Sequence, residues 1–352
     1  MKGNIQSEID SHLATLRKLI TPKGLFLAAA EEGVSTGYDK SWLRDNFYEV
    51  MAFEETGDWE TANTTWHALL DIFLKHEDKI NWAIEKRPQF TYQYIHARYH
   101  PETFEELWEE WGNKQNDAVG CILFAIGKHE LEGNSVMRDN NDKRIVQRLA
   151  DYLVRLEYWH DADNGIWEEY EEIHTSSVGA CVAGLKKIKE AGLAEVDDGA
   201  IEKGQESLNQ RLPRESKTKF TDLALLSLLY PYNVVSGEQA RAILSNLEYH
   251  LSKGKGVIRY RNDYYYNANE DGYSEEAEWT MGFPWLSIIY RERGEHEKAD
   301  FWLDMARKAK DPEGKMPELY FSQTDVPNEN NPLGWSESLM IIALKKKLDS
   351  QK

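Results

Sequence analysis

The chain has 352 residues, with 61 acidic and 42 basic side chains and a net charge of −19 at neutral pH. This charge argues against nucleic acid and anionic membranes as partners, because both are negatively charged and would repel the protein. The sequence contains no apolar run near the roughly 20 residues that cross a bilayer, and its first residues lack the apolar stretch of a secretory signal. We therefore expect a cytoplasmic protein that does not bind membranes.

The cysteine and histidine patterns favour neither disulfides nor metal sites. Cys121 and Cys181 each lie in a run of Val, Ile, Leu and Ala, which is typical of buried thiols that act as small apolar residues. The ten histidines are scattered, without an HExxH motif or a Cys/His cluster. Glycine-rich nucleotide-binding motifs are also absent from the sequence. We expect no metal and no cofactor.

Apolar residues recur at helical spacing along the whole chain, whereas strand-like alternation is scarce. Ile145, Leu149 and Leu153 mark one apolar stripe, and Ser236 with Gln239 has the pattern of a capping box. The pattern predicts twelve helices, which begin near Ser7, Asp45, Asp58, Asp117, Asp142, Ser176, Gly199, Phe220, Ser236, Glu276, Glu295 and Gly334. No linker rich in Pro, Gly or Ser divides them, so we expect one domain over residues 1–352.

Segments rich in aromatic and charged residues precede alternate helices of this set. They are residues 37–45, 109–117, 164–169, 258–266 with 276–279, and 316–320. Successive connections in an up-and-down helical array alternate between its two ends, so all of these segments should meet at one end. The sequence therefore predicts an all-α fold, an (α/α)6 barrel of six inner and six outer helices. The N-terminal ends of the inner helices would surround one shared site.

Two of the many carboxyl groups stand in contexts that favour acid–base chemistry. Glu168 follows Trp167, whose indole can shield the carboxyl group from water and favour the protonated form that a general acid needs. A nearby helix N-terminus would oppose this effect. Glu318 lies between Pro317 and Leu319 in an otherwise apolar segment. Hydrolysis of a glycosidic bond needs one acid and one base and no metal, although a solvated surface glutamate is the alternative for each residue.

Ten short motifs run from about Leu25 to Leu344 and read WLRDNFYEVMA, HARYH, WGNKQNDA, GIWEE, SSVG, LPRES, RYRND, EAEW, PELY and PLGWSESLMIIAL. With these motifs the chain resembles glycoside hydrolase family 15, which includes glucoamylases and the isomaltose- and dextran-type glucohydrolases. It is most similar to the glucoamylase-like domain of the phosphorylase kinase α and β subunits. The resemblance implies an (α/α)6 barrel, in agreement with the helix pattern.

The resemblance also implies an activity and a set of site residues. Glu168 takes the position of the general acid and Glu318 that of the general base in an exo-acting, inverting hydrolase, which would release glucose from the non-reducing end of small isomalto- or malto-oligosaccharides. The implied substrate-binding residues are Tyr38, Trp42, Arg44, Asp45, Trp111, Asp117, Trp167, Glu169, Arg259 and Trp279. The alternatives are a simple ion pair for Arg44 with Asp45 and core packing for Trp279. We expect Asp263 not to touch the sugar.

Two other functions compete with this one. The first is a catalytically silent sugar-binding or regulatory domain, suggested by the similarity to kinase subunits, and the second is a trehalase-type hydrolase. The presence of both glutamates together with Arg44 and Asp45 favours an enzyme. The sequence shows neither the N-terminal β-sandwich of many bacterial members nor a starch-binding module, so we expect a small soluble oligosaccharide as substrate and few outer sugar sites. The glycosidic linkage and the oligomeric state stay open.

Overall fold

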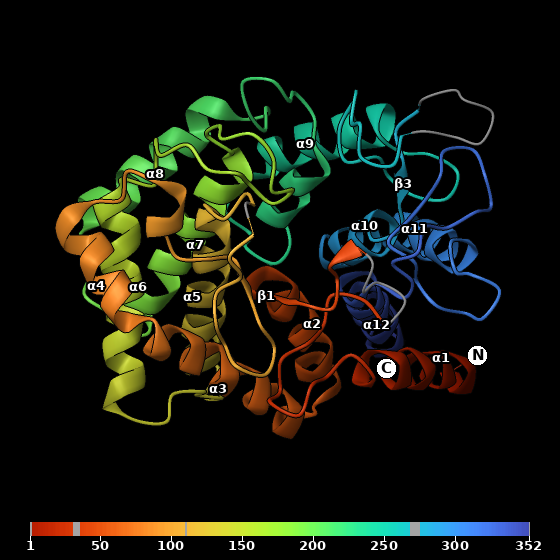
Figure 1. Ribbon diagram of the computed structural model, residues 1–352. Coiled ribbons are helices and arrows are strands. Elements are labelled where there is room, and N and C mark those ends of the chain that lie inside the picture. The colour runs from red at the N-terminus through yellow and green to blue at the C-terminus, as the bar shows by residue number, and fades with distance from the viewer. Residues whose placement is uncertain (1, 31–35, 110, 268–274, 352) are drawn as a thin grey trace.

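The computed structural model describes residues 2–30, 36–109, 111–267 and 275–351 and is built mainly from helices (Figure 1). Its helices are α1 (Lys2–Arg17), α2 (Leu43–Thr56), α3 (Trp59–Lys75), α4 (Glu77–Lys86), η2 (Thr91–Gln93), α5 (Asn116–Leu131), α6 (Asn140–Leu156), α7 (Thr175–Glu190), α8 (Asp198–Arg211), η3 (Leu223–Leu228), α9 (Gly237–His250), α10 (Gly282–Glu292), α11 (His296–Lys308) and α12 (Gly334–Asp349). Two antiparallel pairs of very short strands accompany them. The pairs join β1 (Ser41–Trp42) to β2 (Arg98–Tyr99) and β3 (Glu278–Trp279) to β4 (Leu319–Tyr320).

Six helical segments form a closed inner ring. In order around the ring they are α2, α5, α7, η3, α10 and α12, and α12 packs back against α2. Their residues are buried almost all round; in α5 every residue from Asn116 to Gly127 is buried. A helix that is buried on all sides belongs inside a second layer, because its apolar surface needs cover in every direction.

The outer helices supply that cover and are amphipathic. Helix α6, for example, buries Ile145, Leu149 and Leu153 and exposes the charged residues Lys143, Arg144 and Arg155. In the outer layer α1 packs on α12, α3 on α2, α6 on α5, α8 on α7, α9 on η3 and α11 on α10. The predicted (α/α)6 barrel is confirmed, and the first and last helices lie side by side (Figure 1).

Three predicted elements differ in detail. The inner helix expected near Phe220 is the short 3-10 helix η3, and Pro231 follows soon after it, with no backbone N–H to extend a helix. The helix expected near Glu276 begins at Gly282, because Trp279 exchanges backbone hydrogen bonds with Val257 and is held in an extended conformation. The outer helix expected from Asp58 is divided into α3 and α4.

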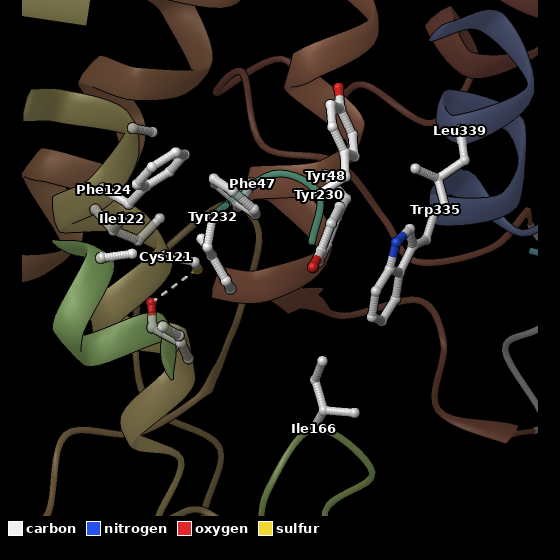
Figure 2. Close-up of a cluster of buried hydrophobic side chains, with 14 of the residues drawn as sticks. Phe47, Tyr48, Cys121, Ile122, Phe124, Ile166, Tyr230, Tyr232, Trp335 and Leu339 are labelled. Atoms are coloured by element: carbon white, nitrogen blue, oxygen red, sulfur yellow. Dashed lines mark hydrogen bonds between the residues drawn. The ribbon is translucent and has the colours of Figure 1, made fainter. Parts of the chain in front are cut away.

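Large aromatic residues fill the centre of the ring (Figure 2). Tyr48 of α2 stacks on Trp335 of α12, with ring centroids 4.3 Å apart and an interplanar angle of 17°. Ile166 approaches this cluster from the loop before α7. Both cysteines are free and buried, which confirms the prediction of structural thiols; the Cys121 Sγ lies 3.2 Å from the Ala118 carbonyl oxygen.

Helices α5 and α7 approach each other so closely that only glycine fits at their contact. A Cβ atom on Gly184 of α7 would lie 2.4 Å from the carbonyl oxygen of Gly120 on α5. A Cβ atom on Gly120 would in turn lie 2.6 Å from the carbonyl carbon of Ala180. The obstacles are backbone atoms, so a substitution could be accommodated only if the two helices moved apart.

We expect Gly184→Ala to lower the free energy of unfolding by about 1–3 kcal/mol, the usual cost of overpacking a tight interior. Urea denaturation followed by circular dichroism measures this. Gly237→Ala is the matched control, because Gly237 is exposed on α9 and its added Cβ would meet nothing closer than the Arg241 side chain at 3.8 Å. Equal unfolding midpoints for the two variants would contradict this account of the α5–α7 contact.

Candidate active site

A cavity of about 500 Å³ opens at the end of the barrel where the inner helices begin. Arg44 and Asp45 reach it from the first turn of α2, and Trp335 reaches it from the first turn of α12. The lining residues are Ala28, Tyr38, Trp42, Arg44, Asp45, Trp111, Ile166, Trp167, Glu168, Arg259, Trp279, Met281, Glu318, Leu333 and Trp335. All of the sequence-predicted site residues lie here except Asp117 and Glu169.

A tight turn before α7 presents Glu168 to this cavity. The Asn164 side chain donates a hydrogen bond to the Glu169 carbonyl oxygen at 2.6 Å and accepts one from the Lys114 backbone N–H at 3.1 Å. Glu168 itself has a φ of 61°, a left-handed conformation that is unfavourable for a residue with a Cβ atom. The surrounding hydrogen bonds therefore impose the backbone conformation that directs this side chain.

Three donors surround the Glu168 carboxylate. Trp111 Nε1 donates to Oε2 at 2.6 Å, while Gln115 Nε2 and Arg44 Nη2 lie 3.0 and 3.4 Å from Oε1. The side chain of Glu168 is 12% exposed, so it can still be reached from the cavity. One carboxylate oxygen is thus held by an indole and the other by an amide and a cation.

Arg44 forms one wall of the cavity, and a carboxylate outside the cavity lining neutralises its charge. Its Nη1 donates to Asp117 Oδ2 at 2.9 Å and to Gln115 Oε1 at 2.8 Å. Asp117 lies in the first turn of α5, so this pair joins α2 to α5. Asp117 pairs with Arg44 and does not itself line the cavity, so its part in substrate binding stays a prediction.

Asp45 is a carboxyl group of the cavity whose pKa is influenced by three charged neighbours. Burial raises its pKa to about 7, with the charges of Glu168 and Glu318 adding to the rise and that of Arg44 opposing it. The negative charges of both candidate catalytic carboxylates therefore raise the pKa of Asp45. Arg44 makes its ion pairs with Asp117 and Glu168, so the alternative of a simple Arg44–Asp45 pair does not describe this site.

Glu318 approaches from the other side of the cavity, beside strand β4, and is 1% exposed. Tyr38 donates to its Oε1 at 2.6 Å, and the side-chain amides of Asn328 and Asn330 both donate to Oε2. Burial raises the pKa of Glu318 above its usual range, and these three hydrogen bonds to the charged form hold the rise back. The carboxylate is oriented by neutral donors and not by a salt bridge at hydrogen-bond distance.

Arg259 forms a second wall within a set of aromatic rings. Its guanidinium carbon lies 4.9 Å from the ring centroids of Trp279 and Tyr265. Behind it, Asp263 forms two hydrogen bonds at 2.6 and 2.7 Å, and Glu169 Oε1 lies 3.0 Å from Nη2. Asp263 thus pairs with Arg259 outside the lining of the cavity, as expected.

Glu169 is fully occupied by protein contacts. Lys219 Nζ lies 2.6 Å from its Oε2, and the Tyr260 hydroxyl lies 2.7 Å from each carboxylate oxygen. Together with the bond to Arg259, these contacts leave Glu169 behind the wall. Glu169 therefore does not itself line the cavity and orients Arg259, and its part in substrate binding stays a prediction.

Sequence reasoning missed several residues of this site. Trp335 lines the cavity, and Trp167 packs near it and donates from Nε1 to Asp222 Oδ1 at 2.8 Å. Arg98 lies against both Trp42 and Trp111, with its guanidinium carbon 5.3 and 4.4 Å from their ring centroids. The motifs that contain Trp335 and Arg98 were recognised, but their side chains were not assigned to the site.

Within the described ranges, no group of three or more His, Cys, Asp or Glu side chains is arranged to hold a metal ion. The same residues include no helix that is both long and apolar enough to pass through a bilayer. The cavity itself is lined by carboxyl groups, two arginines and aromatic side chains.

The raised pKa of Asp45 leads to a prediction about stability and pH. Its folded pKa of about 7 lies above the roughly 3.9 of an unfolded aspartate, so the folded state binds the proton more tightly. Stability is therefore lost as the pH rises from about 4 through about 7. We expect Asp45→Asn to reduce this loss, by up to about 4 kcal/mol at neutral pH. Urea unfolding of both proteins across this range is the measurement, and parallel stability curves would contradict the assignment.

Comparisons with known proteins place this site in a family context. The sequence model of glycosyl hydrolases family 15 matches residues 13–277. The regulatory subunit alpha of phosphorylase b kinase, skeletal muscle isoform, from Oryctolagus cuniculus is 24% identical over 377 residues, which are 87% of this chain and 30% of that protein. An uncharacterized glycosyl hydrolase of Methanocaldococcus jannaschii is 26% identical over 278 residues, which are 65% of this chain and 41% of that protein. The chain thus spans less than a third of the length of the kinase subunit.

Solved structures share the fold. A wild-type glycosidase superposes with a TM-score of 0.81 at 17% identity, covering 99% of this chain and 98% of that one. A variant glycosidase in complex with glucose has the same score, identity and coverage. The glucoamylase of Hormoconis resinae superposes with a TM-score of 0.71 at 12% identity, over 98% of this chain and 73% of that one. These likenesses support the barrel, and the match of the family model shows that the chain belongs to glycosyl hydrolases family 15.

Proposed function

We propose that this protein is an exo-acting, inverting hydrolase of small α-glucosides, with Glu168 as general acid and Glu318 as general base. The observation that carries the proposal is that these two carboxyl groups line one cavity from opposite sides of the barrel. Glu168 precedes α7 and Glu318 precedes α12, and two inner segments lie between these helices in either direction around the ring. A sugar bound in the cavity would have one carboxyl group on each side.

The proposed reaction displaces the leaving group in one step. Glu168 donates its proton to the glycosidic oxygen as the bond to the anomeric carbon breaks. Glu318 accepts a proton from a water molecule, whose oxygen forms the new bond on the opposite face. Inversion requires the two carboxyl groups to be about 6.5–9.5 Å apart so that this water fits, whereas a retaining enzyme needs about 5–5.5 Å. Positions on opposite sides of the ring favour the wider separation.

The environments of the two glutamates suit different roles. Glu318 is buried among the neutral donors Tyr38, Asn328 and Asn330, which orient an ionised carboxylate without neutralising it. Glu168 is the more accessible of the two and contacts Trp111. A base needs an available lone pair at a fixed position, whereas an acid has to reach the leaving oxygen.

The walls of the cavity suit a terminal sugar. Arg44 and Asp45 offer charged partners for sugar hydroxyl groups, and Trp42, Trp167 and Trp279 offer flat apolar faces. These groups support release of one sugar from a chain end.

A catalytically silent regulatory domain is the second candidate. The similarity to a regulatory subunit of phosphorylase b kinase favours it, although this chain covers only 30% of that protein. The same cavity could then bind a sugar without cleaving it. The presence and separate orientation of Glu168 and Glu318 favour the hydrolase, because binding alone does not need two opposed carboxyl groups.

Incubation of the purified protein with maltose, isomaltose, trehalose and short dextrins tests the proposal. We expect glucose release from at least one of them. Proton NMR in the first minutes, before mutarotation, should show β-glucose from an α-linked substrate. Early α-glucose would contradict the assignment of Glu318 as a base. Release from none of the substrates at high protein concentration would favour the silent domain, and release from trehalose alone would favour a trehalase-type enzyme.

The role of Glu168 can be tested separately with Glu168→Gln. The variant cannot protonate a leaving group, so we expect a loss of about 10²- to 10⁴-fold in kcat on natural sugars. α-Glucosyl fluoride has a leaving group that needs no proton, so its hydrolysis should be largely spared. Comparison of kcat on the two substrate types is the measurement. An equal loss on both would show that Glu168 is not the acid.

A further inference from the structure

A second, larger hollow adjoins the candidate active site. It has a volume of about 1490 Å³, and we call it the aromatic groove. Its lining residues are Lys79, Trp82, Phe90, Thr91, Tyr92, Gln93, His96, Glu106, Leu107, Trp108, Glu109, Trp111 and Asn113. Trp108 is 93% exposed and Tyr92 is 65% exposed. Large aromatic side chains concentrated in one open hollow are unusual for a surface with no ligand.

The groove and the active-site cavity share one lining residue, Trp111. The Trp111 ring lies over the guanidinium group of Arg98, which in turn lies against Trp42 of the cavity wall. Arg98 is buried in strand β2, so this shared wall is fixed to the barrel. A chain molecule could therefore extend from one hollow into the other along Trp111.

The contact between Trp111 and Glu168 indicates which part of a substrate would lie in the groove. Trp111 Nε1 donates to Glu168 Oε2 at 2.6 Å. Glu168 is the proposed acid, so it faces the glycosidic oxygen of the leaving group. The part of the substrate beyond that oxygen thus lies on the Trp111 side, where the aromatic groove begins.

The polar groups of the groove suit a neutral ligand. Lys79 is paired with Glu106 at 2.7 and 2.9 Å, and Glu109 is paired with Arg98. The groove thus offers aromatic faces, with these charges already paired.

We propose that the aromatic groove binds the leaving-group end of a linear α-gluco-oligosaccharide whose terminal sugar occupies the active-site cavity. This inference rests on the proposed hydrolase function and extends it to substrate length. Sugar rings present apolar C–H faces to Trp108, Tyr92 and Phe90, which line the groove. The protein then prefers longer oligosaccharides to disaccharides, in contrast to the few outer sugar sites expected from the sequence.

The test compares a Trp108→Ala/Tyr92→Ala double variant with the wild-type protein on α-1,4 and α-1,6 gluco-oligosaccharides from disaccharide to heptasaccharide. The readout is the ratio of kcat/KM for the heptasaccharide to that for the disaccharide. We expect this ratio to fall about tenfold in the double variant, since two ring contacts are removed from the longer substrate only. Tyr249→Ala is the matched control, because Tyr249 is 82% exposed on α9 and lies outside the groove. An unchanged ratio in the double variant would overturn the proposal.

Calorimetric titration separates the groove from the catalytic function. Heptasaccharides of both linkages are titrated into the Glu168→Gln variant, with and without the two groove substitutions. Saturable binding that the groove substitutions weaken about tenfold supports the groove, even if the wild-type protein hydrolyses nothing and the hydrolase proposal falls. Binding that is equal with and without the substitutions, or the absence of binding to either series, would overturn the groove proposal.

Discussion

Two buried arginines form walls of this site, and carboxylates outside the cavity lining neutralise their charges. A guanidinium group removed from water is strongly destabilising unless carboxylates pair with it. Asp117 meets this need for Arg44, and Asp263 with Glu169 meets it for Arg259. Because the Arg44–Asp117 and Arg259–Glu169 pairs join separate segments of the chain, the same electrostatic requirement also fixes those segments relative to one another. The arrangement leaves one face of each cation turned toward the cavity.

The closed ring of inner helices provides the frame for these pairs. The backbones of α5 and α7 meet at glycines, so the distance between these two walls has little freedom. On the other side, β4 and its pairing with β3 place Glu318 by backbone hydrogen bonds, including one from the Thr280 N–H to the Glu318 carbonyl oxygen. The turn of Glu168 is held by Asn164. The two carboxyl groups are therefore positioned by independent local structures on a common rigid ring.

The environments of the cavity and the aromatic groove are complementary. The cavity concentrates charge, with Arg44, Asp45, Glu168, Arg259 and Glu318 around a small volume. The groove presents exposed aromatic rings and paired charges. Charged groups at fixed positions bind the hydroxyl groups of one sugar tightly, whereas open aromatic faces tolerate different sugar positions. This contrast is what a chain-end hydrolase acting on soluble oligosaccharides would need.

The sequence alone determined the class of fold and the end of the barrel that carries the site. All-round burial of alternate helices follows from local apolar patterns. Counting the helices in chain order then shows which connections lie at the same end of the barrel. The motif resemblance then pointed to Glu168, Glu318 and eight more of the fifteen residues that line the cavity. Tertiary structure decided which charged residues face the cavity. Asp117 and Glu169 were indistinguishable in sequence from lining residues, but each turns its carboxylate toward an arginine from behind the wall. Trp335, Arg98 and the aromatic groove also needed the structure, because they depend on contacts between segments far apart in the chain, and local periodicity carries no information about such contacts.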